Sequence, residues 1–234
     1  MKNILIVFKK ELRTYFNSPI AYVVITLFLL LCGYFFIVPL FVVGQASVRH
    51  VMDLFPLLSL FFVPAITMRL LSEEMKSGTI ELLYTMPMKE EEIIIGKYLS
   101  GAALFGMCVV ATVFYPIMLS LIGKVDWGQA MGSYVGAILL GCMFSAAGIF
   151  SSSITKNQII SFITGFVICF IFFIIGQTVP FLPPFLAKTV SFIGVTSHIE
   201  NFNRGVIDSR DIMYFLSVSA FFLYCTLAVM KTKK

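Results

Sequence analysis

The residues of this chain that could perform acid–base chemistry gather in a polar stretch just before its last apolar run. That stretch holds four such side chains, His198, Glu200, Asp208 and Asp211. Each can donate or accept a proton in catalysis, but nothing in their spacing fixes a common geometry. The two histidines, His50 and His198, also lack the spacing of a metal-binding pair. We therefore interpret both as structural or interfacial histidines.

Two glycine–lysine pairs raise the question of phosphate binding. They are Gly96-Lys97 and Gly123-Lys124. A phosphate-binding loop needs an earlier glycine and a Ser or Thr directly after the lysine, and both pairs lack these residues. The apolar runs also carry almost no central acid or base, so they offer no proton relay for an ion-coupled transporter. We expect no nucleotide, metal or cofactor in this chain, and no enzymatic activity.

The most informative pattern is a short charged segment between the second and third apolar runs, residues 73–87. Within it, Ile80, Leu83 and Tyr84 follow the i, i+3, i+4 spacing that makes one apolar stripe on a helix. Such a helix could dock in a groove on a partner protein. It could also fold back on the chain's own helices, and the periodicity alone leaves both interpretations open.

Local signals suggest where this short helix begins and ends. Ser77 can cap a helix that starts at Gly78 or Thr79, and Pro87 ends it. Three glutamates at residues 90–92 then open the next helix, where carboxylates suit the positive end of the helix dipole. The sequence thus predicts a separate short helix at the membrane surface.

The composition shows which solvent surrounds these elements. The chain has 234 residues, of which 59% are hydrophobic and 12% charged, and its mean hydropathy is +0.97. Soluble domains are typically about 45–50% apolar and about 25% charged. Most of the chain is therefore expected to lie in lipid, as a single all-α membrane domain over residues 1–234.

Six apolar runs are long enough, or nearly so, to cross a bilayer as helices, which takes about 20 residues. They are Ile20–Val43, Leu54–Leu71, Tyr98–Ile122, Met131–Ile154, Gln158–Val179 and Ile212–Met230. With six spans and the N-terminus inside, twelve of the 17 Lys and Arg residues fall on the inner side. Because positive charge favours the cytoplasm, both termini and the segment 72–97 are predicted to be cytoplasmic. The net charge of +5 follows from this bias and gives no reason to expect a nucleic-acid partner.

An amphipathic helix is predicted for residues 2–17, lying on the membrane surface. Its apolar sector comprises Ile4, Leu5, Phe8, Leu12, Tyr15 and Phe16. The opposite side carries Lys2, Lys9, Lys10, Arg13 and Asn17. Basic residues opposite aliphatic and aromatic ones are typical of an interfacial helix. Ser18 can cap the following helix, with Pro19 at its first position.

The loop at residues 180–211 is long and begins with an apolar, proline-rich part. Because irregular backbone inside lipid must be covered by protein, we expect a re-entrant or interfacial helical hairpin there, followed by a polar surface segment. Gly132 and Gly136 allow close helix packing, more readily within the chain than between chains. The five cysteines are scattered through the apolar runs and predict free thiols.

The charged segment resembles the intracellular segment of ABC-2 type transporter permeases. The resemblance rests on Glu73, Glu74, Gly78, Thr79, Glu81, Leu82, Leu83, Pro87, Gly96 and Lys97. The match spans about 25 residues at the family's position between spans two and three. Lys89 departs from the family, because a Ser or Thr cap is expected at that position. A weaker likeness, carried by residues 197–211, is to the gliding-motility-associated and nitrous-oxide-reductase-maturation permeases.

The resemblance implies a multi-pass permease of the bacterial cytoplasmic (inner) membrane. Two copies of a cytoplasmic ABC ATPase would bind ATP and Mg²⁺ and act on this subunit. A second permease chain is also implied, forming either a homodimer or a heterodimer with a relative that carries an external domain. The coupling residues implied are Glu73, Glu74, Gly78, Thr79, Ile80, Glu81, Leu83, Tyr84 and Pro87. Glu73 and Glu74 are expected to pair with basic groups of the ATPase or with Arg69.

The function expected is therefore ATP-driven export or force transmission across the membrane. A membrane-embedded enzyme that acts at the outer leaflet through the polar stretch is the alternative, and turnover without nucleotide would support it. A secondary transporter or channel is the third possibility, which flux without ATP would support.

Overall fold

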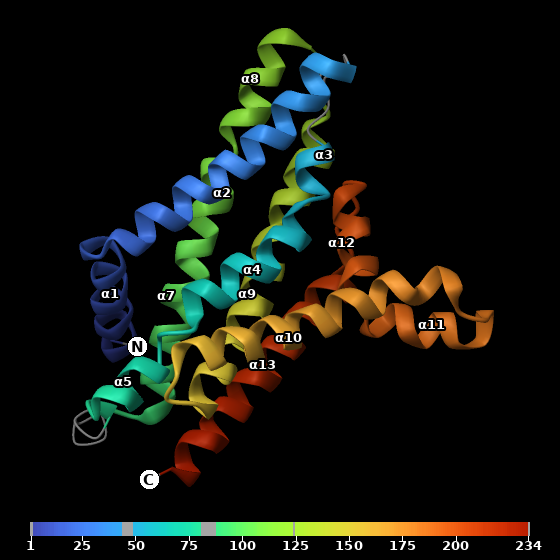
Figure 1. Ribbon diagram of the computed structural model, residues 1–234. Coiled ribbons are helices and arrows are strands. Elements are labelled where there is room, and N and C mark those ends of the chain that lie inside the picture. The colour runs from blue at the N-terminus through green and yellow to red at the C-terminus, as the bar shows by residue number, and fades with distance from the viewer. Residues whose placement is uncertain (1, 44–48, 81–87, 124, 234) are drawn as a thin grey trace.

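The computed structural model describes residues 2–43, 49–80, 88–123 and 125–233, and every regular element within them is a helix (Figure 1). The helices are α1 (Lys2–Asn17), α2 (Pro19–Val38), α3 (Arg49–Met52), α4 (Phe55–Thr67), α5 (Ser72–Ser77), α7 (Glu90–Ala111), α8 (Phe114–Ile122), α9 (Trp127–Ile154), α10 (Gln158–Thr178), α11 (Pro184–Ile193), α12 (Val195–Asn203) and α13 (Ser209–Thr232). A π-helical stretch, Pro39–Val43, prolongs α2, and a 3-10 turn, Val179–Phe181, prolongs α10. The all-α prediction is confirmed.

Within the described residues, six helical stretches are long and apolar enough to span a membrane. They are Pro19–Phe41, Phe55–Ser77, Glu90–Leu121, Trp127–Ile154, Gln158–Phe181 and Ser209–Thr232. These stretches correspond one to one with the six predicted runs. The third begins earlier than the apolar run itself, because the glutamates that precede it are already helical.

Polar side chains fix where the spans begin. Ser18 caps α2 through a 3.2 Å hydrogen bond from the Ile20 amide, with Pro19 at the first helical position, as predicted. Asp126 caps α9 and Asp208 caps α13 in the same way. Each supplies an acceptor to amides that the helix itself leaves without a partner.

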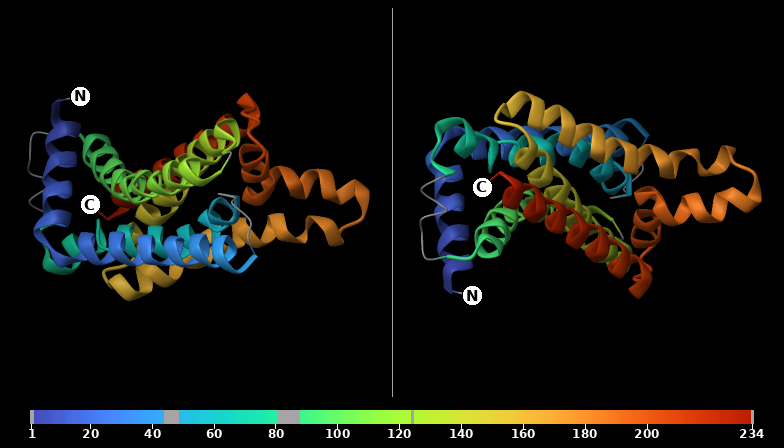
Figure 2. Two further views of the ribbon diagram at one scale, coloured as in Figure 1. Left: turned by 90° about the horizontal axis from the view of Figure 1, so that it is seen from above. Right: turned by 90° about the horizontal axis from the view of Figure 1, so that it is seen from below.

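Helix α9 lies at the centre of the bundle, between the row of α2, α4 and α10 and the pair of α7 and α13 (Figure 2). Small residues let the neighbours approach closely. A side chain at Gly136 would have its Cβ 2.7 Å from the Cβ of Phe202 in α12, and one at Gly132 would meet the Phe202 carbonyl at 2.7 Å. The predicted close packing at this glycine pair therefore occurs within the chain.

The second span differs from its prediction as one continuous helix over residues 54–71. Helix α4 ends at Thr67, residues 68–71 form an elbow, and α5 begins at Ser72. The amides of Leu71 and Ser72 leave the helical pattern and bond to the hydroxyl of Ser152 in α9. The interruption is thus stabilised from a distant part of the chain.

The loop between the fifth and sixth spans forms helices, as expected. Helix α11 returns along α10, and together they extend sideways from the bundle as a hairpin (Figure 2). The two helices pack directly at Gly176 of α10 and Gly194. A Cβ on Gly194 would overlap the Cα of Gly176, so there is no room for a side chain. Both chain termini lie at the other end of the molecule from α8, near α5 (Figure 1).

Candidate functional site

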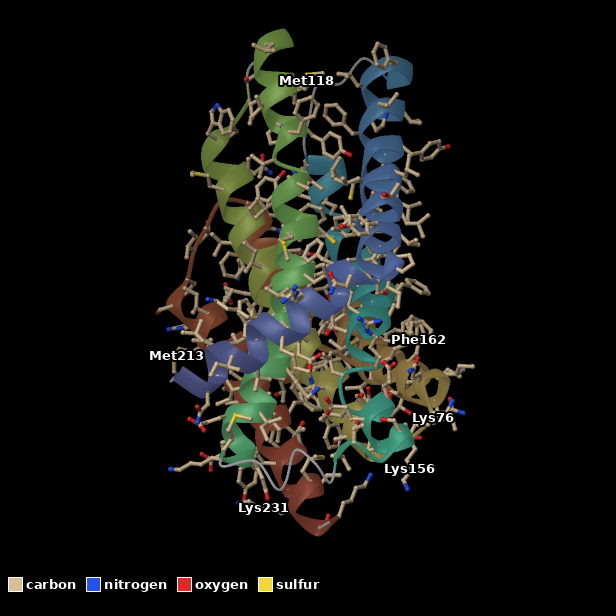
Figure 3. All side chains as sticks on the ribbon, turned by 90° about the vertical axis from the view of Figure 1, so that its left-hand side faces the viewer. Lys76, Met118, Lys156, Phe162, Met213 and Lys231 are labelled. Carbon is tan, nitrogen blue, oxygen red and sulfur yellow. The ribbon has the colours of Figure 1, made fainter. Side chains whose placement is uncertain are left out.

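The predicted coupling segment begins in α5, whose Glu74 meets α1 and the start of α7. Helix α1 lies across α7, and the labelled lysines Lys76, Lys156 and Lys231 lie at this end of the molecule, opposite Met118 (Figure 3). We call the meeting point of α1, α5 and α7 the inner junction. In it the side chains of Glu11, Glu74 and Lys97 lie together.

Helix α1 sits on α7 along a stripe of residues one helical turn apart. Val7, Glu11 and Tyr15 are buried, whereas Leu5 is exposed although the amphipathic prediction placed it in the apolar sector. The seat requires Gly96, because a Cβ there would lie 2.8 Å from the Cβ of Val7 and 3.0 Å from the carbonyl of Ile4. The contact face is thus rotated toward Glu11.

Lys97 is the centre of the inner junction. Its side chain is only 1% exposed, and its ammonium lies 2.9 Å from Glu11 Oε1 and 2.8 Å from Glu74 Oε1. It also donates to the Leu70 carbonyl at 2.8 Å, so all three N–H donors are used. One buried cation thereby joins α1, the elbow, α5 and α7.

Lys10 extends this network toward solvent. Its ammonium lies 3.3 Å from Glu11 Oε1 and 3.5 Å from Glu74 Oε1, and its side chain is largely exposed. Burial alone would raise the pKa of Glu11, but the charges of Lys97 and Lys10 outweigh burial and lower it. Glu11 is therefore ionised on the buried face of α1.

An aromatic contact fixes the end of α1 to the elbow. The Tyr15 hydroxyl donates to the Ile66 carbonyl at 2.7 Å, and the Arg69 guanidinium lies 4.5 Å from the Tyr15 ring centre. Burial raises the pKa of Tyr15, although the Arg69 charge opposes this. Arg69 therefore contacts α1 through the ring of Tyr15. Glu74 forms its ion pairs within the chain with Lys97 and Lys10.

A cavity of about 530 Å³ opens between α1, the elbow and α5. Three predicted coupling residues, Glu73, Glu74 and Thr79, line it. Charges of both signs line the cavity as well, namely those of Lys10, Glu11, Glu73, Glu74, Arg69 and Lys97. Apolar side chains, namely those of Ile6, Val7, Leu70 and Met88, are also part of the lining.

The start of the predicted coupling helix differs from expectation. Ser77 is the last residue of α5, and its hydroxyl donates back to the Glu73 carbonyl at 2.9 Å instead of capping a new helix. Gly78 follows with a φ of +73°, the left-handed geometry that ends helices and favours glycine. The cap predicted at Ser77 is therefore wrong, because the helix of residues 72–77 ends there.

The remaining predicted coupling residues divide into two groups. Ile80 is half-buried and packs against the hydrophobic core, so this member of the stripe contacts the chain's own helices. Glu81, Leu83, Tyr84 and Pro87 lie outside the described residues.

Helix α7 begins with a cap supplied from within the helix. The Lys89 amide donates to Glu92 Oε2 at 3.2 Å, which is the half of a capping box that the third helical residue supplies. Asn3 of α1 donates to the same carboxylate oxygen at 2.9 Å. The carboxylate of Glu92 thus supplies a second link between α1 and α7.

Sequence reasoning missed Glu11, the residue that carries the charge of α1 into the inner junction. The signal was present, because on a helical wheel Glu11 falls beside Ile4 and Tyr15 and not among the basic residues. An acid on an apolar face predicts a buried partner. Lys97 was among the residues that carry the family resemblance, but that resemblance did not indicate that Glu11 and Glu74 are its partners.

The acid–base residues near α13 have structural partners of their own. His198 Nδ1 lies 2.6 Å from Asp211 Oδ1, and Nε2 lies 3.1 Å from the Phe192 carbonyl. Asp208 caps α13, and Glu200 lies 3.6 Å from Arg204 on an exposed helix face. Only His198 and Asp211 of the four come together, in a buried pair.

Comparison with known protein families matches residues 5–230 to the ABC-2 family transporter proteins. No curated protein matches the chain significantly. The family match covers five of the six apolar helices completely, the sixth as far as Met230, and the inner-junction residues Glu11, Glu74 and Lys97. The chain therefore belongs to the ABC-2 transporter family, as a multi-pass membrane component of an ABC transporter.

Proposed function

We propose that this permease is driven from the cytoplasm by two copies of an ABC ATPase, and that the motion enters through residues 73–87 and the inner junction. ATP and Mg²⁺ would be bound by the ATPase. The observation that carries the proposal is Lys97, which binds Glu11 and Glu74 directly beside the start of this segment.

The inner junction suits the transmission of a displacement. Separating a buried ion pair leaves uncompensated charge, which is strongly destabilising. Helices α1, α5 and α7 are therefore expected to move together when the segment after α5 is displaced. Packed elements of this kind change between discrete arrangements, which is what an ATPase cycle requires.

The proposed sidedness follows from charge. Twelve of the 17 Lys and Arg residues fall on the side that carries the inner junction if six helices cross the membrane. The positive-inside rule then places this side and both termini in the cytoplasm. We infer a bacterial inner membrane, with α1 at the lipid surface.

A second permease chain is proposed to complete the pathway, as a homodimer or a heterodimer. The resemblance of residues 197–211 favours the gliding-motility and nitrous-oxide-reductase-maturation permeases, in which a related chain would carry an external domain. The transporter would then export a substrate or transmit force to an external partner.

The test uses the permease reconstituted with its ATPase in nanodiscs. Glu81→Arg and Leu83→Asp should reduce permease-stimulated ATP hydrolysis to the rate of the ATPase alone, while the chain still inserts. Lys156→Ala is the matched control, because Lys156 is exposed in the turn between α9 and α10, outside residues 73–87. Unchanged hydrolysis in both coupling variants would contradict the proposal.

A further inference from the structure

The elbow between α4 and α5 is hydrogen-bonded to α9 through the side chain of Ser152. Ser152 Oγ accepts hydrogen bonds from the amides of Leu71 at 3.0 Å and Ser72 at 2.9 Å. The same hydroxyl donates to the Met68 carbonyl at 2.9 Å. Ser152 is completely buried, so its three hydrogen bonds are shielded from water.

These bonds replace the ones that a continuous helix would have made. The first amides of a helix have no partner within it, and α5 begins at this point. A buried amide without a partner is costly. The elbow cannot separate from α9 unless Leu71 and Ser72 lose their acceptor.

Helix α9 connects the elbow with the other end of the bundle. Next to the elbow, Gly148 lets Thr67 of α4 pack directly against α9. About 24–30 Å from Ser152 along α9, at 1.5 Å per residue, Gly136 and Gly132 pack against Phe202 of α12. A displacement of α9 at Ser152 would therefore reach α12 through closely packed backbone.

We propose that Ser152 is a positioning residue that makes α9 follow the α4–α5 elbow, so that motion entering at α5 reaches α12. This inference rests on the proposed function, since it assumes that the ATPase moves α5. It adds the element that receives the motion, which is α9. Lys97 holds α5 to α1 and α7, and Ser152 holds it to the centre of the bundle.

The test measures amide hydrogen exchange in the full complex in nanodiscs, with and without ATP. Ser152→Ala removes the acceptor, and Ser152→Cys keeps a side chain of similar size with a weak acceptor. Ser153→Ala is the control, because Ser153 is equally buried but donates to the Phe150 carbonyl of its own helix. The peptides of interest cover residues 68–77 and 195–205.

We expect exchange at Leu71 and Ser72 to rise about tenfold in Ser152→Ala, less in Ser152→Cys and not in Ser153→Ala. The ATP-dependent change in residues 195–205 should be lost in the same order. If the wild type shows this ATP-dependent change and Ser152→Ala keeps it, the role proposed for Ser152 is refuted and the proposed function is not. An absent ATP response in the wild type would overturn the proposed function together with this inference.

If Ser152→Ala does not assemble, Ser152→Cys decides the matter. Reduced transmission to residues 195–205 with intact assembly supports the proposal. A response equal to that of Ser153→Ala, despite faster exchange at Leu71 and Ser72, refutes it.

Discussion

The inner junction and the cluster around His198 both bury ionisable side chains, but the two regions differ in how far apart in the sequence the contacting residues lie. At the inner junction, Lys97 reaches Glu11 across 86 residues and the Leu70 carbonyl across 27. Near the start of α13, His198 reaches Asp211 across 13 residues and the Phe192 carbonyl across six. The contacts of Lys97 thus join elements that are remote in the sequence, whereas those of His198 join neighbouring elements into one local unit.

This difference bears on what each region can do. The ring of His198 stacks on Tyr214 at 4.1 Å, and Asn201 donates to Asp211 Oδ2 at 3.0 Å, so α11, α12 and the start of α13 support one another. A region of this kind can be displaced as a body. The inner junction joins α1, α5 and α7, and is suited to making separate helices move together.

The largest effect is expected from Lys97→Met. It leaves the carboxylates of Glu11 and Glu74 without their buried cation, which should lower the free energy of unfolding by about 3–5 kcal/mol. Permease-stimulated ATP hydrolysis should fall as well. Denaturation in nanodiscs measures the first effect, and Lys76→Met on the exposed face of α5 is the control. Equal stability of the two variants would refute the importance of the inner junction.

Gly96→Ala tests the seat of α1. The added methyl group would meet Val7 and the Ile4 carbonyl, and overpacking of this kind costs about 1–3 kcal/mol. Gly106→Ala in the same helix is the control, because no atom of a packing neighbour lies within 4 Å of its added Cβ. Faster hydrogen exchange in α1 for Gly96→Ala only is the expected outcome. Equal exchange in both variants would show that α1 is not seated here.

Asp211→Ala tests the local unit. It removes the acceptor of His198 and Asn201, with an expected loss of about 1–3 kcal/mol. Stimulated ATP hydrolysis should persist, in contrast with Lys97→Met. Combined with Lys97→Met, the stability losses should add within about 0.5 kcal/mol, because the two sites share no partner. A larger coupling energy would contradict the separation of the two regions.

The smallest effect is expected from acid. Burial would raise the pKa of Glu11, but Lys97 and Lys10 outweigh it and lower the pKa from its ordinary 4.5. The stabilisation from this lowered pKa is complete above about pH 4.5 and is lost as the pH falls through the lowered value. Exchange in α1 should therefore rise in that acidic range, and Glu11→Gln should remove this dependence. A Glu11→Gln variant with the wild-type acid response would assign the response to another group.

The sequence was sufficient for features that depend on neighbouring residues. Hydropathy predicted the six spans, and Ser18 with Pro19 predicted the start of α2, because both signals act within a few residues. Helical structure after α10 was also predictable, since the proline-rich apolar stretch could not stay irregular in lipid, but the pairing of α11 with α10 was not predicted.

The features that were missed depend on distant partners. The elbow after Thr67 could not be predicted, because its acceptor is Ser152, 81 residues beyond Leu71. The sequence predicted that Glu74 pairs with a basic group of the ATPase or with Arg69, whereas its partner is Lys97 in the next span. Local patterns state which side chains need partners, and only the packing of the bundle decides which partners they obtain.

The ion pair between Glu11 and Lys97 also constrains biogenesis. The two residues are separated by 86 positions, which a ribosome needs roughly 4–17 seconds to translate at about 5–20 residues per second. During that interval Glu11 has the exposed Lys10 beside it but lacks its buried partner Lys97, so we expect the nascent N-terminal helix to stay at the lipid headgroups. Chains arrested before Lys97 should accordingly expose Glu11 to a water-soluble carboxylate reagent, and chains arrested after the third span has inserted should not. Protection in the shorter chains would show that the helix docks without its lysine.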